Sequence, residues 1–396
     1  MDKLIGPAEA ARRLGVTTQT LRTWDAKGLI KVVRTPGNQR RIPESEILRL
    51  SKSNEYINFG VGNDSFVKEP LPKSYKSFTA KNTKKISKTD ILLMCKDVSV
   101  YNVTSDITLH EKLLPGAMLR KTLSFDEWMQ TRYSAGSNVT ARRLMLRAFG
   151  TDSHENILKA TRALSLSDCY WLKEAHEEIS FNDVTPYLNK EWDGIGKFTG
   201  GSISTLFANG AATKKWLDSK TLLKESSFKE FDAYKLCAEL VPDEYYAKAK
   251  LADNGLHLTN FTSTDKFLES FEQSGFIGDG NDARAVAVEL FGERAVALFV
   301  IDYLVESDDR HWGNIGFLRD TNNGDYVSMA PYFDFDWIWA DWSVALPSNA
   351  YKYKEYISQL CKKAKETSGL FSESGRNNVI IKRADELLQF LYSADY

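Results

Sequence analysis

A segment rich in Gly, Pro, Ser and Lys interrupts the chain after its first fifty residues and limits the folds that it can adopt. It spans residues 53–88, and its composition is typical of a linker. A chain of 396 residues is also longer than most single domains. The sequence therefore predicts a small head at residues 1–52 and a larger body that begins at residue 89.

Charge separates the same two parts. Residues 1–52 carry 11 of the 52 lysines and arginines but only 5 of the 53 acidic residues, which gives the head a net charge of +6 and leaves −7 for the rest. The whole chain, at −1, has no charge excess that would attract nucleic acid or membranes in general. Any nucleic-acid binding is thus expected from the head.

The head begins with two short helical patterns. The first runs from Pro7, which suits a helix start, to Gly15, which suits a helix end. The second is capped by Thr17 and ends at Gly28. A basic strand, a turn at residues 36–38 and a second basic strand follow. This order predicts a winged helix-turn-helix, whose second helix typically enters the DNA major groove.

The stretch AARRLGVTTQTLRTWDAKGLI, followed by RTPGNQRRIPESEI, resembles the winged domains of the MerR and excisionase class. The resemblance implies contacts with DNA, because arginine and threonine suit phosphates and glutamine or arginine can read base edges. The implied contact residues are Thr17, Thr18, Gln19, Arg22, Arg40 and Arg41. A domain that binds a protein, or the body of this chain, is the alternative. MerR regulators continue into a dimerising helix where this chain has its linker, so a homodimer would have to form elsewhere.

The body shows mixed strand and helix patterns. Residues 90–103 read as one strand or a pair, and residues 315–318 read as a strand. Helices are expected at residues 123–134, 138–150, 153–165 and 285–306. The four cysteines are far apart and form no CxxC pair, so they are expected to act as small buried hydrophobic residues rather than as a disulfide framework or a zinc site.

A glycine- and hydroxyl-rich stretch, GIGKFTGGSISTLFANGAATKKWL, spans residues 194–217. Glycine lets backbone amides wrap a phosphate, although many such loops are only flexible turns. The stretch has no GxxxxGK[ST] pattern, so it is not a Walker loop. Lys215 lies near the end of the stretch, and an apolar strand ending in TLLKE would bring Lys224 toward the glycines, which is how kinases place a lysine on nucleotide phosphates.

A second polar stretch, SDDRHWGN, lies between the expected helix at 285–306 and the strand at 315–318. Asp309 precedes Asn314 by five residues, the spacing of the base and a magnesium ligand in a kinase catalytic loop. Asp334, in MAPYFDFDW, can supply the second magnesium ligand. Alone, each motif has an ordinary explanation: a solvated loop in which Asp308 or Asp309 pairs with Arg310, or a strand with outward-facing acids. Their joint order favours a kinase.

The motifs DRHWGN, MAPYFDF and NGAATKKWL…TLLKES together resemble those of the HipA family of bacterial kinases over residues 89–396. The resemblance implies a multidomain α+β protein: the winged head, then a bilobal kinase-like domain with a mixed N-lobe at 89–240 and a helical C-lobe at 241–396. It further implies that ATP and Mg²⁺ are the cofactors and that a Ser or Thr hydroxyl of a protein receives the γ-phosphate.

The same resemblance implies roles for individual residues. Asp309 would be the base, His311 would stabilise the loop, and Asn314 and Asp334 would bind Mg²⁺. Lys224 would contact the ATP phosphates, with Lys215 as a second contact and either Glu230 or Glu239 as the partner of Lys224. The nucleotide loop would comprise Gly200, Gly201, Ser202 and Ser204, and the candidates for autophosphorylation are Ser202, Ser204 and Thr205.

Three functions follow for the whole chain. The first is a protein Ser/Thr kinase with a DNA-binding head, a toxin–antitoxin or defence regulator whose targets would be an aminoacyl-tRNA synthetase or a translation factor. The second is a kinase of a lipid or small molecule, since the DRHxxN element is similar to that of phosphoinositide kinases. The third is a DNA-binding regulator with an inactive kinase body. The sequence lacks a signal peptide and a run of 18 apolar residues, so a cytoplasmic location without membrane contact is expected.

Overall fold

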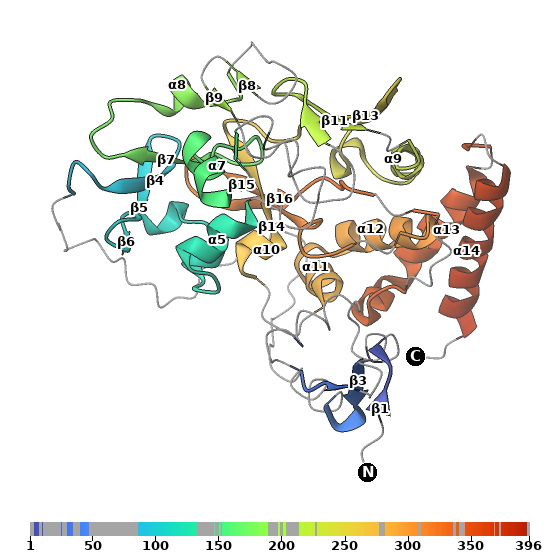
Figure 1. Ribbon diagram of the computed structural model, residues 1–396. Coiled ribbons are helices and arrows are strands. Elements are labelled where there is room, and N and C mark those ends of the chain that lie inside the picture. The colour runs from blue at the N-terminus through green and yellow to red at the C-terminus, as the bar shows by residue number, and fades with distance from the viewer. Residues whose placement is uncertain are drawn as a thin grey trace. The chain divides into compact units, whose positions relative to one another are not determined.

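The computed structural model shows mixed α+β structure in two compact units. One comprises Met1–Lys68 with Gly278–Asp282, and the other comprises Glu69–Ile277 with Ala283–Tyr396. We call them the head unit and the body unit, and Figure 1 shows their elements. The structure describes residues 4–7, 10, 25, 30–34, 40–46, 86–132, 146, 150–151, 153–188, 197–198, 201–202, 214–225, 228–276, 282–307, 310–335, 338–339, 345–367, 369–371 and 374–393.

The head unit contains a three-stranded antiparallel sheet in the order β1-β3-β2. β2 (Val33–Arg34) pairs with β3 (Arg40–Pro43), with Arg34 opposite Arg40. The two basic strands predicted for the wing are therefore confirmed. β1 (Leu4–Ile5) pairs with the other edge of β3, a strand that the sequence did not indicate because it is only two residues long.

The body unit begins with an antiparallel sheet in the order β6-β5-β4-β7. Its strands are β4 (Ile91–Cys95), β5 (Val98–Asn102), β6 (Ile107–Thr108) and β7 (Tyr170–Glu174). The pattern at 90–103 is thus a pair of strands, joined by a tight turn. The core against this sheet includes Trp128 and Trp171, both of which are almost completely buried.

Short helices accompany this sheet. They are a 3₁₀ turn at Glu111–Leu113, α4 (Gly116–Leu119), α5 (Phe125–Thr131), α7 (His154–Ala160) and α8 (Phe181–Val184). α5 and α7 confirm the predictions at 123–134 and 153–165, and α5 starts at a capping box between Ser124 and Glu127. Most of the predicted helix at 138–150 lies outside the described residues.

A second antiparallel sheet has the order β10-β11-β13-β12. Its strands are β10 (Lys214–Trp216), β11 (Thr221–Glu225), β12 (Ala249–Ala252) and β13 (Gly255–Thr259), with α9 (Phe231–Leu240) and a 3₁₀ turn (Asp243–Tyr245) between β11 and β12. β10 and β11 confirm the predicted hairpin. β11 pairs with β13, so this sheet draws strands from both sides of residue 240, the predicted lobe boundary. In the glycine-rich stretch, β8 (Lys197–Phe198) pairs with β9 (Gly201–Ser202).

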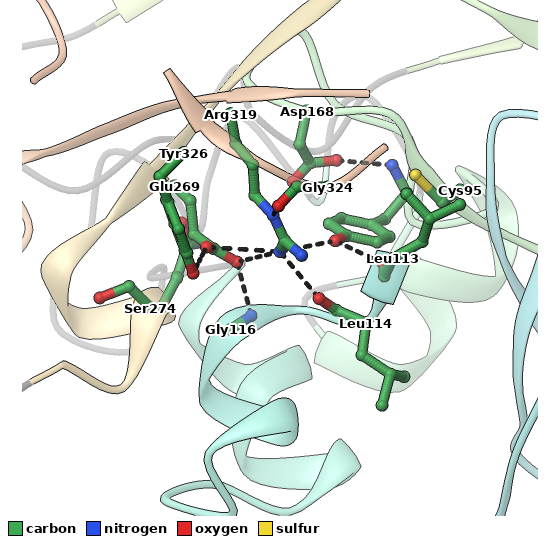
Figure 2. Close-up of polar contacts among 12 residues, drawn as sticks. Cys95, Leu113, Leu114, Gly116, Asp168, Glu269, Ser274, Arg319, Gly324 and Tyr326 are labelled. Atoms are coloured by element: carbon green, nitrogen blue, oxygen red, sulfur yellow. Dashed lines mark hydrogen bonds and ion pairs between the residues drawn. The ribbon is translucent and has the colours of Figure 1, made fainter. Parts of the chain in front are cut away.

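A third sheet, in the order β14-β15-β16, comprises β14 (Lys266–Ser270), β15 (Gly316–Asp320) and β16 (Tyr326–Met329). β15 confirms the strand predicted at 315–318. Figure 2 shows how this sheet is joined to the first part of the body: the Arg319 guanidinium lies 3.2 Å from a Glu269 carboxylate oxygen and donates to the Leu114 carbonyl at 2.8 Å. Glu269 in turn accepts from the Gly116 N–H at 2.7 Å. This network satisfies the buried charge of Arg319.

The rest of the body unit is helical. It contains α10 (Phe271–Ser274), α11 (Ala283–Phe291), α12 (Glu293–Leu304), a 3₁₀ turn (Ser348–Tyr353), α13 (Lys354–Glu366) and α14 (Ser374–Ser393). α12 is mostly buried, and α13 packs beside α14 (Figure 1). The single helix predicted at 285–306 is wrong, because Gly292 has φ 55° and ψ −129° and so separates two helices. None of the helices that the structure describes has the length and hydropathy of a membrane span.

The four cysteines are all buried and free, as expected for small apolar side chains. The Sγ atoms of Cys95 and Cys169 lie 3.2 Å apart in the first sheet. Burial raises the pKa of the Cys169 thiol well above its usual value, so this thiol stays protonated and unreactive.

Candidate active site

The candidate site centres on Lys224, in the middle of the second sheet. Lys224 pairs with Lys214 on one side and with Leu256 on the other, and its side chain is only 1% exposed. Residues directly opposite on paired strands project to the same face of a sheet. The paired strands β10 and β11 therefore present Lys214 and Lys224 side by side.

Two carboxylates neutralise Lys224. Its Nζ lies 2.5 Å from Oε2 of Glu230 and 2.7 Å from Oδ1 of Asp334. Sequence had left Glu230 and Glu239 as alternative partners, and the structure identifies Glu230, which is buried, whereas Glu239 is exposed on α9. A lysine this deeply buried is tolerated only with such partners.

Glu230 is itself held by two further groups. Its Oε1 accepts from the backbone N–H of Phe335 at 2.9 Å and from the Tyr234 hydroxyl at 3.1 Å. Burial raises the pKa of Tyr234 well above its usual value, and the charges of Glu230 and Asp334 add to this effect. Tyr234 therefore remains a donor, and Glu230 connects β11 to α9 and to the segment that carries Asp334.

Asp334 has a left-handed backbone with φ 62°. Aspartate and asparagine tolerate this conformation better than most residues, and such residues cluster at functional sites. Phe333, Asp334 and Phe335 lie outside any strand, so the described part of this segment does not favour the alternative of a strand with outward-facing acids. Residues 336 and 337 lie outside the described residues.

Lys214 is a site residue that the sequence did not single out. Its Nζ lies 3.3 Å from Oδ1 and 3.4 Å from Oδ2 of Asp334, and its side chain is buried. Sequence had favoured its neighbour Lys215, whose side chain lies outside the described residues. The register of the hairpin could have identified Lys214 from the sequence. The residue opposite Lys224 projects to the same face of the sheet, whereas the next residue along the strand projects to the other face.

The loop before β15 carries Arg310, His311 and Asn314. Asn314 is buried, and its N–H donates to the His311 carbonyl at 2.9 Å. The His311 Nδ1 accepts from the Gly313 N–H at 3.0 Å, which agrees with a role in shaping the loop. Asp308 and Asp309 lie outside the described residues.

Arg310 does not behave like part of a solvated loop. It is buried, and it forms a two-point ion pair with Asp302 of α12, with Nε–Oδ2 at 2.9 Å and Nη2–Oδ1 at 3.0 Å. Burial raises the pKa of Asp302, an effect that the Arg310 guanidinium opposes. The sequence gave Asp302 no role, because an acid in a mostly apolar helix carries no signal about its partner.

Residues predicted for the nucleotide loop are only partly described. The backbone of Gly201 and Ser202 forms β9, with Ser202 opposite Lys197. The side chain of Ser202 lies outside what the structure describes. The other loop residues, Gly200, Ser204 and Thr205, lie outside the described residues.

In the head unit, the predicted DNA contacts Thr17, Thr18, Gln19 and Arg22 lie outside the described residues. Arg40 and Arg34 both bind Asp25, with nitrogen–oxygen distances of 2.7 and 2.9 Å. The hydrogen bond from Arg40 lowers the pKa of Asp25 despite some burial. Asp25 lies near the end of the predicted second helix, so its two ion pairs link this position to both wing strands.

The donors at the candidate active site fit a hard cation with few protein ligands. Asp334 offers carboxylate oxygens and Asn314 an amide oxygen, which are ligands typical of Mg²⁺. Within the described part of the chain, no three His, Cys, Asp or Glu side chains gather as a metal cage. A metal here would therefore depend on phosphate and water for its other ligands. Lys214 and Lys224 beside it supply positive charge for such phosphates.

Comparison with known families gives a sequence match within the head. A family model described as MerR family regulatory protein matches residues 7–42, so the head carries a MerR-type domain. No curated protein matches the chain in sequence. Similarity to solved structures is low, and it does not by itself define an activity for the body.

Two solved structures illustrate this similarity. One is a crystal structure of the Helicobacter pylori proinflammatory kinase CtkA, with 14% identity, coverage of 46% of this chain and 94% of that chain, and a TM-score of 0.33. The other is the Shewanella oneidensis MR-1 toxin–antitoxin complex of HipA, HipB and operator DNA, with 11% identity, coverage of 76% and 97%, and a TM-score of 0.45.

Proposed function

We propose that the body unit is a kinase that transfers the γ-phosphate of ATP to a Ser or Thr hydroxyl of a protein. The observation that carries this proposal is the buried contact of Lys224 with both Glu230 and Asp334. Protein kinases need a strand lysine paired with a helix-region glutamate, and a metal-binding aspartate close by. The lysine, the glutamate and the aspartate lie in contact here, although Lys224 and Asp334 are 110 residues apart in sequence.

Each residue of the site has its own role in this proposal. Lys224 and Lys214 bind phosphate oxygens, with Lys215 as a further candidate, and Gly200, Gly201, Ser202 and Ser204 form the loop over them. Asn314 and Asp334 hold Mg²⁺, which when bound neutralises charge on the phosphates. Asp309 accepts the proton of the attacking hydroxyl. The acceptor is a protein, for which an aminoacyl-tRNA synthetase or a translation factor is a candidate, or the chain itself at Ser202, Ser204 or Thr205.

A transfer assay with γ-labelled ATP and Mg²⁺ tests this proposal. We expect label on the wild-type protein or on an added protein acceptor, and a loss of about 10²-fold or more in Asp309→Asn and Asp334→Asn, because each removes a group needed in the transition state. Asp243→Asn is the matched control, since that side chain is 80% exposed. Equal labelling of all four proteins would show that these residues do not carry the reaction.

We further propose that the head unit binds DNA, so that the kinase acts as a DNA-associated regulator of a toxin–antitoxin or defence type. The MerR-type match over residues 7–42 and the +6 charge of residues 1–52 support this. The wing strands, held to Asp25, present the basic residues Arg40 and Arg41 on one hairpin.

Fluorescence anisotropy with a labelled duplex from the region upstream of the protein's own coding sequence tests DNA binding. We expect Arg22→Ala and Arg41→Ala to weaken binding about tenfold and to reduce the salt dependence by about one phosphate contact each. Lys382→Ala, at an exposed position of α14, should bind as the wild type does. If the three variants bind alike, the head does not use these residues on DNA.

A further inference from the structure

Arg310 occupies a central position between three segments of the body unit. Its guanidinium is anchored at two points by Asp302 of α12, and its side chain is only 3% exposed. The Cζ atom also lies 4.8 Å from the centre of the Phe335 ring. A planar guanidinium held at two points has a fixed orientation, so its remaining N–H groups point in fixed directions.

Those remaining N–H groups reach the two halves of the candidate metal site. Nη1 donates to the carbonyl of Asn314 at 3.1 Å and to the carbonyl of Phe333, the residue before Asp334, at 2.8 Å. Asn314 and Asp334 are twenty positions apart in sequence and lie on different loops. One nitrogen atom of Arg310 thus holds both loops.

The backbone on the C-terminal side of Asp334 is also fixed by a hydrogen bond. The N–H of Phe335, the residue after Asp334, donates to Glu230, the partner of Lys224. Asp334, with its left-handed backbone, is therefore clamped by Arg310 on one side and by Glu230 on the other. Mg²⁺ demands ligands in near-ideal octahedral positions at short distances, so the spacing of the two loops matters for binding it.

We propose that Arg310, fixed by Asp302, is a positioning residue that sets the spacing between Asn314 and Asp334 and thereby the affinity of the site for a divalent cation. This inference rests on the proposed function of Asn314 and Asp334 as metal ligands. Arg310 needs no contact with substrate, because it acts through the backbone of its neighbours.

The test compares two buried arginine–aspartate pairs in the full-length protein. Arg132 and Asp168 form the matched control: they pair through two contacts, both side chains are buried, and Arg132 also donates to the Ala163 carbonyl at 2.6 Å. That pair lies in the part of the body built around the first sheet. The variants are Arg310→Gln, Arg310→Lys and Asp302→Asn, against Arg132→Gln and Asp168→Asn.

Three quantities are measured for each variant: Mn²⁺ binding by electron paramagnetic resonance, the Mg²⁺ concentration for half-maximal phosphate transfer, and the unfolding temperature. We expect Arg310→Gln to weaken Mn²⁺ binding and to raise the Mg²⁺ requirement about tenfold. Arg310→Lys should do the same, because a single ammonium group cannot span Asp302 and both carbonyls. The control variants should lower the unfolding temperature and leave both metal constants within about twofold of wild type.

The outcomes distinguish a positioning role of Arg310 from a purely structural role. If Arg310 and Arg132 variants lose stability alike while their metal constants match the wild type, Arg310 is only structural and the proposal is overturned. Should Arg310→Gln fail to fold, Asp302→Asn, which keeps the shape of the pair, decides: an unchanged metal constant overturns the proposal and a raised one supports it. A wild-type protein that neither binds Mn²⁺ nor transfers phosphate would instead overturn the proposed function, and this inference with it.

Discussion

At the scale of single residues, the site is defined by a balance of buried charge. Lys214 and Lys224 face Glu230 and Asp334, with Lys224 in contact with both carboxylates. Removing one member of a buried pair leaves an uncompensated charge, which costs about 3–5 kcal/mol, whereas removing both members costs much less. The pair Lys224–Glu230 should therefore be strongly coupled.

A double-mutant cycle measures this coupling. We expect Lys224→Met and Glu230→Gln each to lower the free energy of unfolding, and the double variant to lose about 1–3 kcal/mol less than the sum of the two. The exposed pair Glu155 and Lys159, one turn apart on α7, is the control and should show almost no coupling. Additive losses at Lys224 and Glu230 would contradict the contact.

The sequence could predict some of these residues and not others. The sequence singled out Lys224 and Asp334 for a nucleotide and metal site, but it did not predict the contact between their side chains that the structure shows. Glu230 could not be separated from Glu239, because helix and loop spacing do not show which acid turns inward. Sequence reasoning chose Lys215 in place of Lys214, a shift of one position in the strand register. It also missed the link from Asp302 to Arg310, because an acid in a mostly apolar helix does not show which residue it pairs with.

At the scale of elements, the second sheet holds Lys224 in place by close backbone contact. Gly255 of β13 lies opposite Glu225, and a Cβ built on Gly255 would overlap the Lys224 carbonyl oxygen. β11 and β13 can therefore approach only because residue 255 is glycine. Any side chain there would push β11, and with it Lys224, away from Glu230.

Element types were predicted better than element boundaries. The hairpin of β10 and β11, the strand β15 and the helices α5 and α7 all follow from periodicity. The break between α11 and α12 did not, since a glycine inside a helical pattern is often tolerated. Here Gly292 adopts a conformation that only glycine accepts readily, with the Tyr353 hydroxyl 3.1 Å from where a Cβ would lie.

At the scale of the whole molecule, one chain joins a MerR-type head to a body that holds the site we propose for a kinase. The division that the sequence predicted from composition and charge lies between residues 53 and 88, and the first segment of the head unit, Met1–Lys68, ends within this range. Charge favours nucleic acid as the ligand of the head and leaves the body mildly acidic. The proposed function therefore requires that the body unit alone forms the magnesium–nucleotide site.

Calorimetric titration of the full-length protein with ATP, with and without Mg²⁺, tests that requirement most directly. We predict that Mg²⁺ strengthens ATP binding of the wild type at least tenfold, because Asp334 and Asn314 hold the metal against the phosphates that Lys224 binds. In Asp334→Asn this enhancement should disappear. The absence of ATP binding by the wild type, or an equal enhancement in Asp334→Asn, would contradict the assignment of this site.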